Sequence, residues 1–188
     1  SPGGLTIESK VFVGEAATVE VMSPLGLFEV KFGLAEEDHL VAHGTVTLSP
    51  AQDLLLPFWP RDLYPLGLDG DPLSVQGTVL AAQRGFNTPA VFFTTDAPDG
   101  MAMYFQNLTA LNEFSKLTKT RPDGVVTGAW PELGYQPAGS TEATSQPKDP
   151  LPRGKPVVVS DWILQAQGER VDDEDEQGRL LVNWLSLC

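Results

Sequence analysis

The stretch that decides the fold is residues 27–32, LFEVKF, in which apolar and charged side chains alternate. Phe28, Val30 and Phe32 fall on one side of an extended chain, and the charged residues between them fall on the other. A period of two is typical of a half-buried antiparallel strand, with one face in the core and one in water.

Similar short runs, rich in β-branched and aromatic residues, recur along the chain. They cover residues 5–7, 10–13, 18–22, 45–48, 74–80, 90–95, 101–105, 157–159 and 162–166. Turn-forming residues separate them, and at Gly14, Ser23-Pro24 and Gly44 we expect turns or bends. The pattern predicts an all-β fold, a two-sheet antiparallel sandwich of roughly ten or more short strands.

Helical spacing appears in only two places. Leu108, Leu111, Phe114 and Leu117 share one face of a predicted short helix over 108–117. Asn107 is a good N-cap for that helix, with Thr109 as an alternative, and the capping role would explain Asn107 without any ligand contact. At the carboxyl end, the acidic run 172–176 precedes a second helical set, and we interpret residues 171–188 as the start of a linker helix towards a further domain.

Residues 1–170 are therefore predicted to form one β-sandwich domain. Within it, residues 136–156, QPAGSTEATSQPKDPLPRGKP, are rich in Pro, Ser and Thr and almost free of large apolar groups. We expect this segment to be a mobile excursion.

Composition narrows the function classes. The 188 residues include 12 Lys or Arg and 25 Asp or Glu, which gives a formal charge of −13. Nucleic-acid binding depends on basic clusters, and the sequence has none, while attraction to anionic membranes is disfavoured for the same reason. Neutral ligands and neutral or basic protein surfaces remain as partners.

The single cysteine, Cys188, excludes an intramolecular disulfide and fits a reducing compartment, which favours a cytoplasmic location. No apolar run reaches the ~20 residues that cross a bilayer. The first ten residues lack the pattern of a signal peptide.

Candidate site residues occur in four strings where aromatic side chains stand beside amide, guanidinium or carboxylate groups. They are Trp59, Arg61, Asp62 and Tyr64; Gln83 and Arg84; Gln106 and Asn107; and Trp130, Glu132 and Tyr135. Such residues suit flat polar ligands such as sugars, or a closely fitted interface between domains. We expect them to converge on one face, and the competing interpretation for each residue is local packing.

No complete catalytic motif accompanies these strings. There is no G-x-S-x-G, no phosphate-binding glycine loop and no dinucleotide fingerprint. His39 and His43 lie in a stretch that does not look helical, so we expect solvent-facing histidines and no metal site. Neither a cofactor nor a catalytic residue is predicted, although Asp62, Glu132 and Asp161 are candidate acids and bases if the chain is an enzyme.

Two local strings, YFQNLTALNEF and GAWPELGYQP, together with the order of β-domain, mobile excursion and nascent helix, resemble the amino-terminal β-sandwich region of large carbohydrate-active enzymes. These are enzymes whose catalytic domain is a barrel of six helical hairpins, or related glycoside hydrolases. The resemblance implies a non-catalytic accessory domain that packs on the catalytic domain and contacts carbohydrate at the interface. The alternative is a free-standing carbohydrate-active enzyme or a lectin-like binding module.

Overall fold

The computed structural model describes residues 6–13, 16–34, 41–57, 76–82, 90–95, 100–120, 124–130, 132–137, 146–167 and 171–185. The strands are β1 (Thr6–Val13), β2 (Ala16–Ser23), β3 (Gly26–Leu34), β4 (Val41–Pro50), β5 (Gly77–Ala82), β6 (Ala90–Thr95), β7 (Met101–Gln106), β8 (Gly124–Ala129), β9 (Glu132–Pro137) and β10 (Val157–Gln167). The helices are α1 (Asn112–Thr118) and α3 (Glu174–Leu185). The predominantly β fold expected from the sequence is confirmed.

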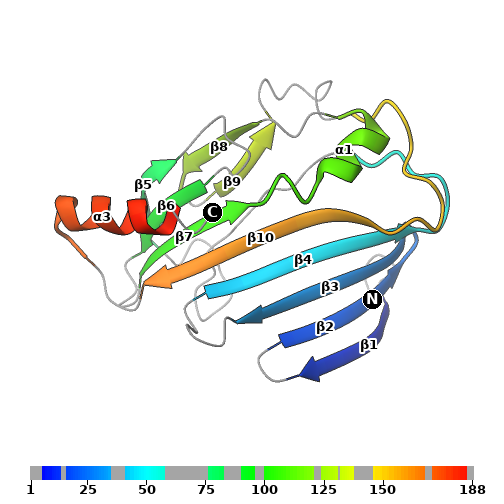
Figure 1. Ribbon diagram of the computed structural model, residues 1–188, viewed down its shortest axis with the longest axis horizontal. Coiled ribbons are helices and arrows are strands. Elements are labelled where there is room, and N and C mark those ends of the chain that lie inside the picture. The colour runs from blue at the N-terminus through cyan, green and yellow to red at the C-terminus, as the bar shows by residue number, and fades with distance from the viewer. Residues whose placement is uncertain are drawn as a thin grey trace.

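Eight strands form one antiparallel sheet in the order β1-β2-β3-β4-β10-β7-β6-β5, and β8 and β9 form a separate two-stranded hairpin. The sheet is strongly twisted, with β1 at one edge and β5 at the other (Figure 1). The runs at 157–159 and 162–166, for which the sequence predicts one or two strands, form the single strand β10. A register shift between Val158 and Ser160 lets β10 follow the twist of the sheet.

The register assigns side chains to two faces. Directly opposed residues of neighbouring antiparallel strands point to the same side, so Phe32 of β3 shares a face with Ala17 of β2 and Gly44 of β4. Gly44 is in turn opposite Trp162 of β10. We call this side the hairpin face and the other side the α3 face. The alternation predicted for 27–32 is thereby confirmed, but Phe32, which is 47% exposed, does not lie in the core.

The main core lies on the hairpin face, under α1 and the β8–β9 hairpin. Its buried members are Leu48, Val91, Phe93, Tyr104, Leu108, Leu111, Phe114, Leu151 and Val157. The apolar face predicted for residues 108–117 supplies several of them. Trp130, which follows β8, packs on the ring of Phe93 with 6.0 Å between ring centroids.

A second core lies on the α3 face of the same half of the sheet. Ala90, Phe92, Met101, Met103 and Phe105 are buried there. Leu180 and Leu181 of α3 pack against them, so the helix predicted near the carboxyl end folds back onto the sheet. Its connection to a further domain stays a prediction.

The helix α1 begins later than predicted. Residues 108–111 form a turn in which Ala110 N donates to Asn107 O at 3.2 Å and Leu111 N donates to Leu108 O at 3.1 Å. These bonds span three residues and are tighter than α-helical ones. Asn107 is therefore not the N-cap: its side-chain oxygen accepts from Thr109 N, 3.2 Å away, and closes the turn that precedes the helix.

The prediction of a bend at Gly44 is wrong, because Gly44 lies inside β4. The indole of Trp162 occupies the space where a side chain at position 44 would project. Gly44 is thus required by the close approach of an aromatic ring.

The later part of the predicted mobile segment 136–156 is attached to the domain. Leu151 is fully buried, and it exchanges backbone hydrogen bonds with Leu54 at 3.0 and 2.8 Å. Lys148 N donates to Thr118 O at 2.8 Å, next to the end of α1. The predicted mobility of the segment stays a prediction, and these contacts anchor residues 146–156.

Candidate functional site

Most of the sequence-predicted site residues are not placed. Trp59, Arg61, Asp62, Tyr64, Gln83 and Arg84 lie outside the described residues. Glu132 and Tyr135 are positioned on β9, opposite Ala129 and Val126 of β8. The expected convergence of the four strings on one face therefore stays a prediction.

Gln106 belongs to a buried hydrogen-bond network. Its side-chain nitrogen donates to Tyr104 Oη at 3.0 Å and to Ser160 Oγ at 3.2 Å, and its side-chain oxygen accepts from Asp161 N at 3.3 Å. With only 2% of its surface exposed, Gln106 links β7 to β10 and does not face a ligand.

Trp130 also has a packing role. Its ring lies on Phe93 and over Gly77 of β5, where an added Cβ would come within 2.5 Å of it. Gln106 and Trp130 both border the hairpin-face core, and the local-packing interpretation accounts for both.

A different cluster stands on the α3 face, centred on Asp161 of β10. The Asp161 side chain is only 12% exposed, and its two oxygens have different partners. His43 Nε2 lies 3.1 Å from Oδ1, and Thr45 Oγ1 donates to Oδ2 at 3.3 Å. Because an ionised carboxylate only accepts hydrogen bonds, Nε2 of His43 is the donor in its contact with Asp161.

The elements around Asp161 explain this arrangement. Residues 43 and 45 lie two apart on β4, so both side chains leave the same face. Thr45 is directly opposite Asp161 in the register, and His43 is opposite Ile163, the next residue of β10 on that face. The carboxylate thus fixes the position of an imidazole that is itself 55% exposed.

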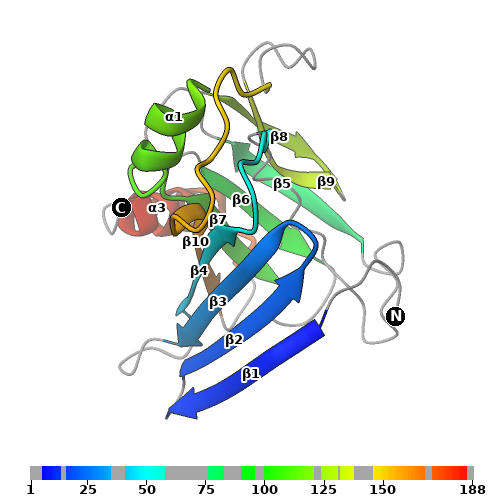
Figure 2. The ribbon, with the colours of Figure 1, turned by 90° about the vertical axis from the view of Figure 1, so that its right-hand side faces the viewer.

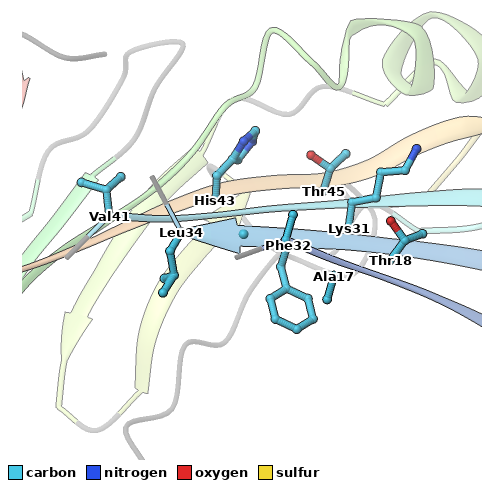
Figure 3. A pocket seen from close by; sticks show the side chains of 10 residues that line it. Ala17, Thr18, Lys31, Phe32, Leu34, Val41, His43 and Thr45 are labelled. Carbon is cyan, nitrogen blue, oxygen red and sulfur yellow. The ribbon is translucent and has the colours of Figure 1, made fainter. Parts of the chain in front are cut away.

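Next to this cluster the sheet surface is hollowed, with a volume of about 550 Å³. We call this cavity the His43 hollow. Its lining residues are Ala16, Ala17, Thr18, Lys31, Phe32, Gly33, Leu34, Val41, His43 and Thr45. Figure 3 shows Lys31, His43 and Thr45 projecting to one side of the sheet, while Phe32 and Leu34 project to the other.

The sequence prediction identified Asp161 as a candidate acid or base, and it treated His43 as a solvated residue. The signal for the cluster is the spacing of His43 and Thr45, which puts two polar side chains on one face of a strand. Their partner lies 118 residues from His43, and the sequence does not reveal that contact.

The described part of the chain contains no group of three or more His, Cys, Asp or Glu residues able to hold a metal ion. Of its two helices, α1 and α3, neither is long and apolar enough to cross a membrane.

Comparisons with known proteins add no relative. No protein-family model matches this chain, and neither a curated protein nor a solved structure is significantly similar to it.

Proposed function

We propose that this chain is a non-catalytic accessory β-domain that docks onto an adjoining catalytic domain of the same polypeptide, in an enzyme that acts on carbohydrate. The observation that supports docking is a group of exposed apolar side chains at one corner of the sheet. We call this group the apolar corner: Phe12 of β1 with Phe32 and Leu34 of β3, which share the hairpin face.

The corner residues adjoin one another through the register. Phe12 is opposite Ala17, which is opposite Phe32, so the two phenyl groups flank a small buried alanine on the hairpin face. Phe12 is 69% exposed, Phe32 is 47% exposed and Leu34 is 44% exposed. Contiguous apolar surface of this kind on a folded domain is typical of a protein interface.

The position of the corner also supports docking. The half of the sheet formed by β5, β6 and β7 has α1 and the hairpin on one face and α3 on the other. In Figure 2 the strands β1, β2 and β3 extend away from those covering elements. A docked domain would add a second layer over this half and complete the two-sheet sandwich that the sequence predicts.

The chemistry of the partner follows from the corner and from the charge of the chain. The partner surface is expected to be apolar where it meets Phe12 and Phe32, because buried apolar area drives most stable association. Its rim is expected to be neutral or basic, because the chain has a formal charge of −13.

The test is a binding measurement between this chain and the adjoining domain, produced as a separate polypeptide from the same open reading frame. The variant Phe12→Ser is expected to raise the dissociation constant about tenfold or more, since it removes the centre of the proposed contact. Calorimetry or biolayer interferometry measures the change.

The matched control is Leu55→Ser. Leu55 is 59% exposed and follows β4, at the end of the strands opposite the apolar corner, so its loss is expected to leave binding unchanged. Equal weakening by both variants would contradict docking at the corner. A reading frame without an adjoining catalytic domain would contradict the accessory role itself.

A further inference from the structure

We propose that the His43 hollow binds a neutral polyhydroxylated ligand of the size of one sugar ring, through Thr18, Lys31, His43 and Thr45. The hollow lies on the α3 face, so this site is separate from docking of a protein at Phe12, which projects from the hairpin face. The inference rests on the geometry of the hollow and does not require the proposed accessory role.

Two adjacent rows of register-paired residues build the site. In one row, Thr18 of β2 is opposite Lys31 of β3, which is opposite Thr45 of β4. In the neighbouring row, Ala16 is opposite Gly33, which is opposite His43. The small residues Ala16 and Gly33 form the floor, and the polar side chains stand around it.

The two basic side chains that line the hollow, Lys31 and His43, each lie beside a carboxylate of the protein. Lys31 Nζ lies 2.7 Å from Glu29 Oε1, and His43 Nε2 lies 3.1 Å from Asp161 Oδ1. Among the described residues that line the hollow, no basic side chain is therefore left without a carboxylate beside it, and the formal charge of −13 repels anions further. A neutral ligand needs no cation from the site and is not repelled by the negative charge of the chain.

The remaining hydrogen-bonding capacity is mixed. The ammonium of Lys31 keeps donors beyond the one used by Glu29, and Asp161 engages only one of the two ring nitrogens of His43. Thr45 Oγ1 donates to Asp161 and keeps its lone pairs as acceptors, while the hydroxyl of Thr18 can act in either role. The neighbouring hydroxyl groups of a sugar ring each donate and accept hydrogen bonds, so they can use both the donors and the acceptors of the site.

Asp161 fixes the positions of His43 and Thr45 in the site. An exposed imidazole on a strand samples several rotamers, and ordering it on binding costs free energy. The buried carboxylate holds His43 in place before a ligand arrives, so His43 and Thr45 are positioned by the same group.

The test is a titration of the ¹⁵N-labelled chain, followed in ¹H–¹⁵N spectra, with methyl α-D-glucopyranoside, with methyl β-D-galactopyranoside and with inorganic phosphate at constant ionic strength. At least one glycoside is expected to shift the backbone amide signals of Ala16, Thr18, Gly33 and His43 with a millimolar dissociation constant, and phosphate is expected to shift none of them. Binding of phosphate alone, or of no probe, would overturn the proposal.

Variants locate the effect. Gly33→Val keeps every polar group and fills the floor, so it is expected to abolish the shifts while circular dichroism shows a folded chain. Thr18→Val removes one hydroxyl and is expected to weaken binding about fivefold. Thr47→Val is the matched control, because Thr47 lies on the same face of β4, opposite Glu29, and does not line the hollow.

Unchanged binding by Gly33→Val would place the ligand elsewhere and overturn the proposal. Phe12→Ser tests independence, because Phe12 projects from the opposite face. It is expected to bind the glycoside normally even where it weakens docking, so failure of one proposal is distinguishable from failure of the other.

Discussion

Phe114→Ala is expected to lower the free energy of unfolding by about 3–5 kcal/mol, the usual cost of removing a buried phenyl group. Phe114 is 1% exposed and lies in the core that joins α1 to the sheet, together with Leu48 and Leu151. Removal of the ring loses its transfer free energy and leaves a cavity that these neighbours cannot close without moving. Urea denaturation followed by tryptophan fluorescence measures the change.

The control for Phe114 is Val182→Ala in α3. Val182 is 66% exposed, so its truncation is expected to change stability by no more than about 0.5 kcal/mol. A loss below about 1 kcal/mol for Phe114→Ala would mean that the contacts of α1 contribute little to the domain.

Gly26→Ala is expected to destabilise the domain by about 3 kcal/mol or more, because backbone strain and steric overlap add at this position. Gly26 begins β3 with a φ of +143°, which residues with a side chain rarely adopt. An added Cβ would overlap the carbonyl oxygen of Ser49 and would lie 2.8 Å from the backbone nitrogen of Ala51. Rigid backbone atoms cannot move aside as a side chain can.

Gly154→Ala separates the two contributions. Gly154 also has a positive φ, +70°, and an added Cβ there meets nothing within 4 Å. This variant is expected to cost only the conformational strain, about 1 kcal/mol. Thermal unfolding of the two variants gives the difference, and equal losses would show that the overlap at Gly26 is relieved by a shift of the turn.

The strands were predictable because their signal is local. The alternation at residues 27–32 requires no knowledge of the partner strand, and β3 forms as predicted. The apolar spacing of residues 108–117 likewise gave the buried face of α1. The start of α1 was predicted too early. The turn after Asn107 has hydrogen bonds that span three residues instead of four, and the sequence pattern does not distinguish these two kinds of turn.

The long-range pairs were not predictable in the same way. Gly44 looks like a turn residue in the sequence, and only the ring of Trp162, which comes from a distant strand, explains its place inside β4. The cluster of His43, Thr45 and Asp161 has the same origin. Both features arise where β10 joins β4, and no local pattern specifies which strands become neighbours.

The central position of β10 has a consequence for the order in which the chain is made. The strands β1 to β4 and the strands β5 to β7 are each contiguous in the sheet, yet β10, which the ribosome adds last among the strands, separates the two groups. During synthesis the two groups therefore emerge as incomplete half-sheets, each with an unpaired inner edge, and neither can protect that edge alone. We expect nascent chains arrested before Val157 to remain sensitive to protease and to bind chaperones. Both properties are expected to be lost once Gln167 has left the exit tunnel, because β10 can then pair with β4 and β7. Resistance to protease before β10 emerges would show instead that the half-sheets are stable by themselves.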